Sequence, residues 1–243
     1  MFRFVRECLK FAIAVLVLGS LFTLTAQDTP GSPDAGRLKT GVSIYRTISD
    51  GKEEGQSRIT IRQAKATGNF VFSANITGAF DQSWESVATP RFHAVSANLS
   101  FGGKEGRKSA FDLKYGDGRV TGSAAAHRSS PARSIDDAVP PDVVDQRIDW
   151  ATVLAGDLKP GSEFRFEVYD PWIGISKAVA KVGPVEQVRV PAGTFAAYRV
   201  TYRIEKSTGA ETYQVLASEA IPRIMVREDF PDGARSELIQ MEP

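Results

Sequence analysis

Downstream of Gly41, apolar and polar residues alternate in a series of short segments. In the stretch NFVFSANI, for example, one phase of the alternation comprises Phe70, Phe72, Ala74 and Ile76. A period of two is typical of strands that bury one face and expose the other. The whole pattern predicts about eleven or twelve strands.

Turn residues separate these segments. Asp50-Gly51 and Asp117-Gly118 are typical two-residue hairpin turns, because both positions of such a turn require a positive φ. The sequence VPAGTF predicts another tight hairpin connection at Pro191–Thr194, with Gly193 at the end of the turn.

One segment has helical spacing. Val144, Ile148, Ala151 and Ala155 recur at intervals of three to four, so we expect a helix near 142–155 with Asp142 as its N-cap. The preceding residues, 122–141, break the alternation and predict a long connection, which in compact domains is usually a lid, a binding loop or disordered.

These elements predict a mainly β protein: an antiparallel curved sheet or half-open β-barrel with one packed amphipathic helix. We expect a single β-rich domain over residues 41–243. Residues 27–40 are rich in Pro, Gly, Ser and Asp and are expected to form a flexible leader.

The N-terminus has the layout of a secretory signal peptide. Arg3, Arg6 and Lys10 precede the uncharged segment 11–26, and Ala26 is suited to cleavage. We therefore expect residues 1–26 to be a signal peptide and the protein to be periplasmic or otherwise exported in a Gram-negative-type bacterium, without a membrane span after cleavage. The alternative is an uncleaved N-terminal anchor in the inner membrane.

Composition narrows the function further. The 243 residues include 30 Lys and Arg against 29 Asp and Glu, for a net charge of +1. The sequence therefore lacks the excess of basic residues that is typical of nucleic-acid-binding proteins. The only cysteine, Cys8, lies in the signal segment, so the mature chain would have neither disulfide nor thiolate. We expect no metal and no cofactor.

Candidates for catalysis are few. His93 and His127 are the only histidines, and His127 lies near Ser129 and Ser130 but without an elbow motif or an identified acid. Asp145 and Asp149 are four residues apart, and we interpret them as part of a solvated helix face. We therefore expect the protein not to be an enzyme.

Aromatic residues give the strongest indication of a ligand site. Several lie on the apolar phases of their strands or on the helix, and they either fill the core or, if the sheet is open, line a cavity for an apolar ligand. The cavity candidates are Phe70, Phe72, Phe101, Phe111, Trp150, Phe164, Phe166 and Phe195.

The motifs GKEEGQSRITIR, PPDVVDQRIDWATVL, LKPGSEFRFEV, VRVPAGTFAAYRV and PRIMVREDFPDGARSELIQ occur in this order between about Val42 and Gln240. Together they resemble a family of exported bacterial β-rich domains of unknown function, which is similar to the periplasmic lipoprotein-carrier fold. The resemblance implies an envelope location, a half-open barrel around a helix and an apolar ligand, but no catalytic residues.

The function that we expect is a non-enzymatic envelope protein that binds or carries a lipid-like or acyl ligand. One alternative is a structural or interaction module with a filled barrel, which would bind an envelope protein partner through its sheet edges or the 122–141 segment. Another is a periplasmic hydrolase, which would need a cleft that brings a Ser, Asp or Glu beside one of the histidines.

Overall fold

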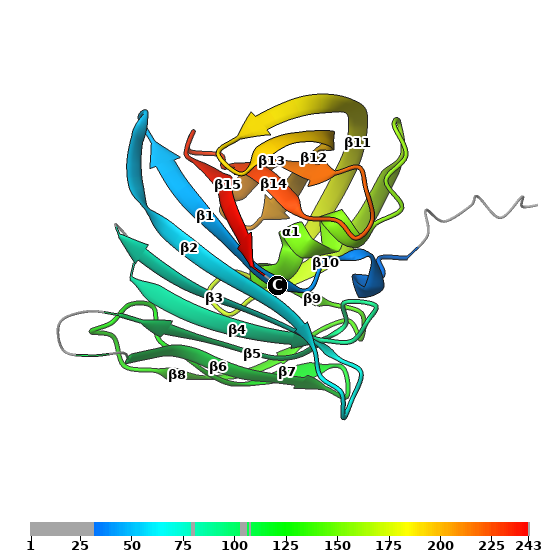
Figure 1. Cartoon of the computed structure of the whole chain (residues 1–243). Helices are drawn as coiled ribbons and strands as arrows, with labels where there is room; N and C mark the ends of the chain where they lie inside the picture. Colours follow the sequence, from blue (N-terminus) through cyan, green and yellow to red (C-terminus); the bar gives the residue numbers. More distant parts are fainter. Residues whose placement is uncertain (1–31, 79–80, 103–105, 107, 243) are drawn as a thin grey trace, which may run out of the picture.

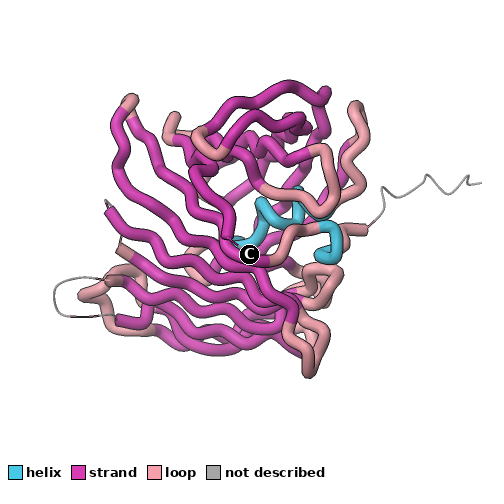
Figure 2. Tube along the Cα trace, viewed as in Figure 1, coloured by secondary structure: helices cyan, strands magenta, loops and turns pink. Residues whose placement is uncertain are grey.

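The structure is a computed structural model that describes residues 32–78, 81–102, 106 and 108–242. The expected signal peptide and the expected leader up to residue 31 lie outside the described residues. The described part is a mainly β fold with one curved, non-closed sheet and one short α-helix, which confirms the expected fold class (Figures 1 and 2).

The first half of the sheet is a meander of neighbouring antiparallel strands. Its strands are β1 (Gly41–Ser49), β2 (Lys52–Gln63), β3 (Phe70–Gly78), β4 (Gln82–Ala88), β5 (Ala94–Phe101), β6 (Lys108–Gly116), β7 (Arg119–Ala124) and β8 (Arg133–Ala138). The expected Asp-Gly hairpins are confirmed: Asp50 and Gly51 have φ of 50° and 74° between β1 and β2, and both positions of such a turn need a positive φ.

The second half continues from β1 through the C-terminal strand. Its strands are β9 (Val144–Asp145), β10 (Glu163–Asp170), β11 (Gly174–Val190), β12 (Gly193–Lys206), β13 (Gly209–Ser218), β14 (Met225–Asp229) and β15 (Arg235–Glu242). The full order is β8-β7-β6-β5-β4-β3-β2-β1-β15-β14-β13-β12-β11-β10-β9, and only β9 with β10 is parallel. The sheet curves so that its two halves enclose α1 (Asp149–Ala155) (Figure 1).

Some expected connections are strands instead. Residues 122–141 include the end of β7 and all of β8, so the predicted long loop is wrong. Strand β8 was not predicted because this segment is rich in Ser, Ala and Arg. Ile135 is the one buried residue of β8, and it pairs with Gly122 of β7. Strand β11 is the longest in the described residues, and its register shifts at a bulge between Val182 and Val185.

The helix begins later than expected. Asp142 is not its N-cap, because Val144 and Asp145 pair with β10 as the short strand β9 and are followed by a 3-10 turn, η2 (Gln146–Ile148). Asp145 caps that turn by accepting a hydrogen bond from the Arg147 backbone N–H. All seven residues of α1 are buried, so its polar side chains point into the interior rather than to solvent.

The C-terminal end of α1 is held by two arginines. Arg37 donates to the carbonyl of Ala155, and Arg223 donates to the carbonyls of Leu154 and Gly156 at 2.8 and 2.7 Å. These carbonyls lack partners within a helix, and cations are favourable at this end. Arg37 belongs to a short 3-10 helix, η1 (Ala35–Arg37), which lies in the described part of the expected leader and contacts the end of α1.

The two ends of the sheet meet through side chains, a junction we call the seam. Tyr169 of β10 donates to the Asp137 carboxylate of β8 at 2.6 Å, and Trp172 donates to the carbonyl of Ala125 at 3.1 Å. Arg133 of β8 also donates to a backbone carbonyl in the turn that follows β10. No strand ladder joins β8 to β9 or β10 in the described residues, so side chains complete the ring.

Candidate functional site

A pocket of about 390 Å³ lies on the concave face of the sheet beside α1, and we call it the inner pocket. Strands β2, β3 and β4 contribute Ile59, Ala74 and Trp84 to one wall. These three positions pair across the ladder in one register, so the alternation that buries them also aligns them. The other walls come from η2, α1 and strands β12–β15.

Two buried carboxyl groups line the inner pocket. Asp149 at the start of α1 is 6% exposed, and Glu228 on β14 is 7% exposed. Asp149 accepts the Trp150 N–H at 2.6 Å through Oδ1, and Glu228 accepts the Tyr202 hydroxyl at 3.0 Å through Oε1. The other oxygen of each carboxyl group makes no hydrogen bond or ion pair to any described residue.

Burial makes both groups weak acids. It raises the pKa of Asp149 from 3.8 to about 7, although the Trp150 N–H and the charges of Arg147 and Lys206 act to lower it. Burial, followed by the charge of Asp149, raises the pKa of Glu228 from 4.5 to about 8. The pair therefore exchanges protons near neutral pH, which is unusual for carboxyl groups.

Aromatic side chains form the wall next to this pair. Tyr202 of β12 and Tyr213 of β13 stack with ring centroids 5.0 Å apart, because Tyr202 and Tyr213 are directly paired across the ladder. Phe230 contacts Tyr213 edge-on at 6.4 Å. Trp84 and Trp150 line the pocket as well. The inner pocket thus combines an apolar, aromatic surface with a small number of polar groups, as ligand pockets generally do.

A buried ion cluster adjoins the inner pocket around Arg147, which itself lines the pocket. Its guanidinium group bonds to Asp145 at 3.2 Å and to Asp170 at 3.0 Å, and it lies 4.9 Å from the Phe111 ring centroid. Tyr115 donates to the second oxygen of Asp145 at 3.0 Å. Burial opposes the charge of Arg147, but the two carboxylates outweigh it and hold the pKa of Arg147 above its usual value. The positive charge of Arg147 is thus already compensated.

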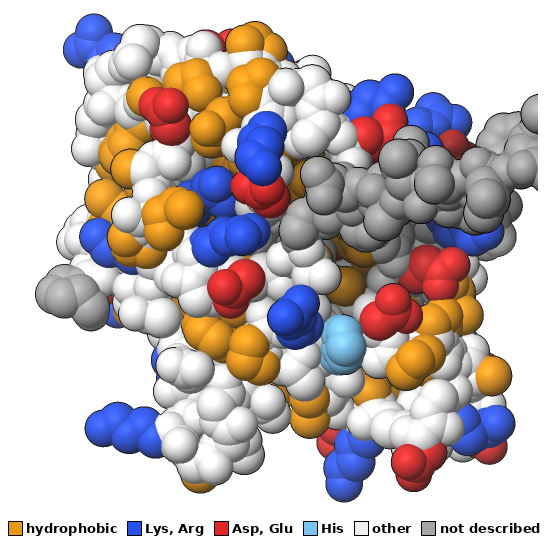
Figure 3. All heavy atoms as spheres, turned by 90° about the vertical axis from the view of Figure 1, so that its right-hand side faces the viewer, with side chains coloured by type: hydrophobic (Ala, Val, Ile, Leu, Met, Phe, Trp, Pro, Cys, Tyr) orange, Lys and Arg blue, Asp and Glu red, His pale blue; other side chains and the backbone are white. Residues whose placement is uncertain are grey.

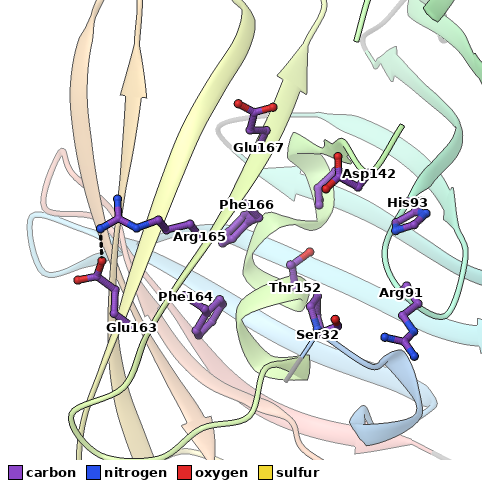
Figure 4. A pocket seen from close by; sticks show the side chains of 12 residues that line it. Ser32, Arg91, His93, Asp142, Thr152, Glu163, Phe164, Arg165, Phe166 and Glu167 are labelled. Atoms are coloured by element: carbon purple, nitrogen blue, oxygen red, sulfur yellow. Dashed lines mark hydrogen bonds and ion pairs between the residues drawn. The ribbon is translucent and has the colours of Figure 1, made fainter. Parts of the chain in front are cut away.

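A second, outer pocket of about 690 Å³ lies on the other side of α1. Phe164 and Phe166 of β10 point toward the helix, and Asp142, His93 and other polar residues form the opposite side (Figure 4). On the molecular face turned toward the viewer in Figure 3, acidic, basic and apolar side chains are mixed. The outer pocket is therefore larger than the inner one, and α1 contributes to both, with Thr152 at the outer pocket and Asp149 and Trp150 at the inner one.

The eight aromatic cavity candidates do not gather in one place. Trp150 lines the inner pocket, and Phe164 and Phe166 line the outer pocket. The other five line neither pocket: Phe101 and Phe195 are half-buried against the core, and three are core residues, namely Phe70, Phe72 and Phe111.

The interpretation of Asp145 and Asp149 as a solvated helix face is wrong. Asp145 is fully buried in the Arg147 cluster, and Asp149 is buried at the inner pocket. The error follows from the late start of α1, because Asp145 precedes the helix and the helix has no solvated face. Arg147 forms an ion pair with Asp145, whereas only its charge acts on Asp149.

Both histidines are exposed. His127 Nδ1 and Ser129 Oγ are 2.8 Å apart, so the serine–histidine contact considered from the sequence does form. No carboxylate among the described residues bonds to His127, and both side chains sit on one exposed loop. The pair thus lacks the orienting acid and the enclosed cleft that nucleophilic catalysis requires.

Sequence reasoning missed Glu228 and its tyrosine neighbours. A signal was present: Glu228 stands between Val226 and Phe230 at a spacing of two in a strand-like segment. A charged residue on an apolar phase indicates either an edge or a buried functional group. Tyr202 and Tyr213 showed no comparable signal, because their pairing depends on strand register.

Residues 36–238 match the family described as "Protein of unknown function (DUF3108)". The chain is a DUF3108 protein. This bears out the resemblance to a β-rich family of unknown function. No curated protein matches the DUF3108 chain.

The described fold also resembles solved structures. A β-barrel-like protein of the DUF1849 domain from Brucella abortus is similar with a TM-score of 0.55 at 13% identity, covering 85% of the DUF3108 chain and 98% of its own. A protein from Bacteroides fragilis described as exported, with a YmcC-like fold, has a TM-score of 0.40 at 10% identity, covering 88% and 100%. A protein from Parabacteroides distasonis described as a lipoprotein has a TM-score of 0.36 at 12% identity, covering 87% and 100%. The first likeness supports the barrel-like fold.

Two further searches of the described residues were negative. None of their helices has the length and apolar character to cross a bilayer. They also contain no group of three or more His, Cys, Asp or Glu side chains placed to hold a metal ion.

Proposed function

We propose that this DUF3108 protein is an exported, non-enzymatic envelope protein that binds a hydrophobic, lipid-like ligand in the inner pocket. The observation that carries the proposal is the aromatic and aliphatic lining of a 390 Å³ space inside a curved sheet. Its volume lies within the usual range of about 300–1,000 Å³ for small-molecule sites. The layout of residues 1–26 supports export.

The seam supports a binding role. A small closed barrel fills with its own side chains, whereas an open or larger one leaves interior space. Here the sheet has fifteen strands in the described residues and is completed only by side-chain contacts. The interior accordingly holds both α1 and an unfilled pocket.

Fluorescence binding tests the proposal. The uncharged probe N-phenyl-1-naphthylamine should bind the purified mature protein, brighten, and be displaced by apolar ligands. The variant Ala234→Trp, which puts a large side chain at the pocket wall, should weaken probe binding by about tenfold or more. The matched control Ala210→Trp places the same side chain at an exposed position on β13 and should bind like the wild type.

Two results would count against the proposal. Probe binding that is equal in both variants would place the ligand outside the inner pocket. An absence of any bound lipid or probe, together with one dominant protein partner trapped by crosslinking in whole cells, would favour the interaction-module alternative.

A further inference from the structure

The inner pocket holds two carboxyl oxygens that lack partners. Asp149 Oδ2 and Glu228 Oε2 make no hydrogen bond or ion pair to any described residue, although each side chain is more than nine-tenths buried. Among the described residues, the fully buried side-chain atoms without a partner are Ser86 Oγ and Arg223 Nε, so the two carboxyl oxygens are not sealed in the core but reach the open space of the pocket. Asp149 and Glu228 line the same pocket, so a ligand there can supply the missing donors.

The charges around this pair are compensated elsewhere. Arg147 lines the pocket but is bound by Asp145 and Asp170. The ammonium group of Lys206, whose charge reaches Asp149, is bound by the carboxylate of Glu211. Neither cation therefore neutralises the carboxyl pair by direct contact.

The aromatic wall fits the same kind of ligand group. Tyr202, Tyr213 and Phe230 line the pocket, and Trp84 and Trp150 line it too. Aromatic faces attract cations, with Trp the strongest, and the attraction grows when water is excluded. Two carboxyl groups among aromatic rings form a binding site for a positive charge attached to an apolar body.

We infer that the ligand of the inner pocket is a cationic amphiphile, whose protonated amine is held by Asp149 and Glu228 and whose apolar part lies against the aromatic wall. This inference rests on the proposed function and names the chemical class of its ligand. A neutral hydrocarbon would leave both carboxyl oxygens without donors. A carboxylate ligand would meet two like groups and could bind only where they hold protons.

The pair should lose protons when the amine binds. A cation favours the ionised form of each carboxyl group, whose pKa values are raised to about 7 and about 8 in the free protein. The affinity for an amine should therefore increase as pH rises through this range. The groups that act on the pair are Arg147, Lys206, Asp145, Asp229, Tyr45, Tyr202 and Tyr213.

Three ligands with the same alkyl chain test the inference: decylamine, decanol and decanoate. Isothermal titration of the mature protein should give tighter binding of decylamine than of decanol by about tenfold or more at pH ~8.5, where the amine is still protonated. Decanoate should bind weakest. Titration at pH ~6.5, where both carboxyl groups still hold protons in the free protein, in buffers of different ionisation enthalpy should show proton release with decylamine only. The affinity for decylamine should increase from pH ~6 to ~8.5.

Variants assign the effect to the carboxyl pair. The double variant Asp149→Asn/Glu228→Gln should lose the preference for decylamine and its proton release, while it keeps decanol binding. The control Glu219→Gln removes one exposed carboxylate and should leave all three affinities unchanged. Circular dichroism of each variant checks that the fold is retained.

The outcomes separate the inference from the proposed function. If decanol or decanoate binds as tightly as decylamine, or if the double variant keeps the amine preference, the cation site is refuted and the hydrophobic pocket stands. If none of the three ligands binds, both are refuted.

Discussion

The variant Glu228→Gln should make the stability of the protein less dependent on pH. Glu228 is buried at the inner pocket, and its pKa in the folded protein is about 8 instead of 4.5. At low pH the group is protonated in both the folded and the unfolded chain. As pH rises above about 4.5, the unfolded chain releases the proton while the folded protein retains it, so stability falls until pH reaches about 8.

The magnitude follows from the same pKa values. The difference between 4.5 and about 8 corresponds to roughly 5 kcal/mol, at about 1.4 kcal/mol for each pH unit. The rise of the Asp149 pKa from 3.8 to about 7 corresponds to about 4 kcal/mol. Between about pH 5 and pH 7 the two groups together should lower the free energy of unfolding by about 3 kcal/mol per pH unit.

Glutamine keeps the shape of Glu228 and can still accept the Tyr202 hydroxyl, but it has no proton to lose. The slope should therefore fall to about half, and the variant should be more stable than the wild type at about pH 8. Urea unfolding at about pH 5, 6, 7 and 8, followed by circular dichroism, measures both quantities. Glu219→Gln, at an exposed position, should reproduce the wild-type slope.

A wild-type stability that is constant between about pH 5 and 7 would refute the reasoning, since the buried pair must then be solvated or already paired. The reasoning would also be refuted if the free energy of unfolding of Glu228→Gln depended on pH as steeply as that of the wild type. The pKa of Glu228 would then be the same in the folded and the unfolded protein.

Three further variants test other parts of the structure. Arg147→Met should lower the free energy of unfolding by about 3–5 kcal/mol, because it leaves the buried carboxylates of the Arg147 cluster uncompensated; a thermal melt that matches the wild type would contradict this. Gly193→Val should cost about 1–3 kcal/mol in urea unfolding, since Gly193 has a φ of 137° at the β11–β12 hairpin, and full stability would refute the strained turn. Tyr169→Phe removes the hydrogen bond to Asp137 and should speed amide exchange in β8 and β10 but not in β1 or β2, whereas uniform acceleration would indicate general destabilisation.

Local patterns predicted much of the fold. Period-two alternation located most strands, and Asp-Gly or Pro-Ala-Gly turns located hairpins, because both depend on neighbouring residues alone. The hairpin at Pro191 is an example, with Val190 paired to Gly193. Strand β8 was missed because its alternation is carried by a single buried residue, Ile135.

The site was less predictable, because it depends on long-range pairing. Asp149 and Glu228 are far apart in the chain, and they meet only because α1 lies inside the curved sheet. A carboxylate on a short helix is usually solvated, but Asp149 is buried because α1 is surrounded by the sheet. Trp150, Phe164 and Phe166 were identified as cavity candidates, but the sequence could not tell that α1 divides them between two pockets.

The seam has a consequence for the size of the interior. In a closed barrel the number and stagger of strands fix the diameter, so the interior can widen only if a ladder breaks. Here side-chain hydrogen bonds, and not a strand ladder, join β8 to β10. Separation of these two strands would leave every backbone ladder intact. The width of the sheet is thus fixed at this point by side chains and not by a ladder, and substitutions at Asp137 or Tyr169 are predicted to loosen the junction without a change of topology.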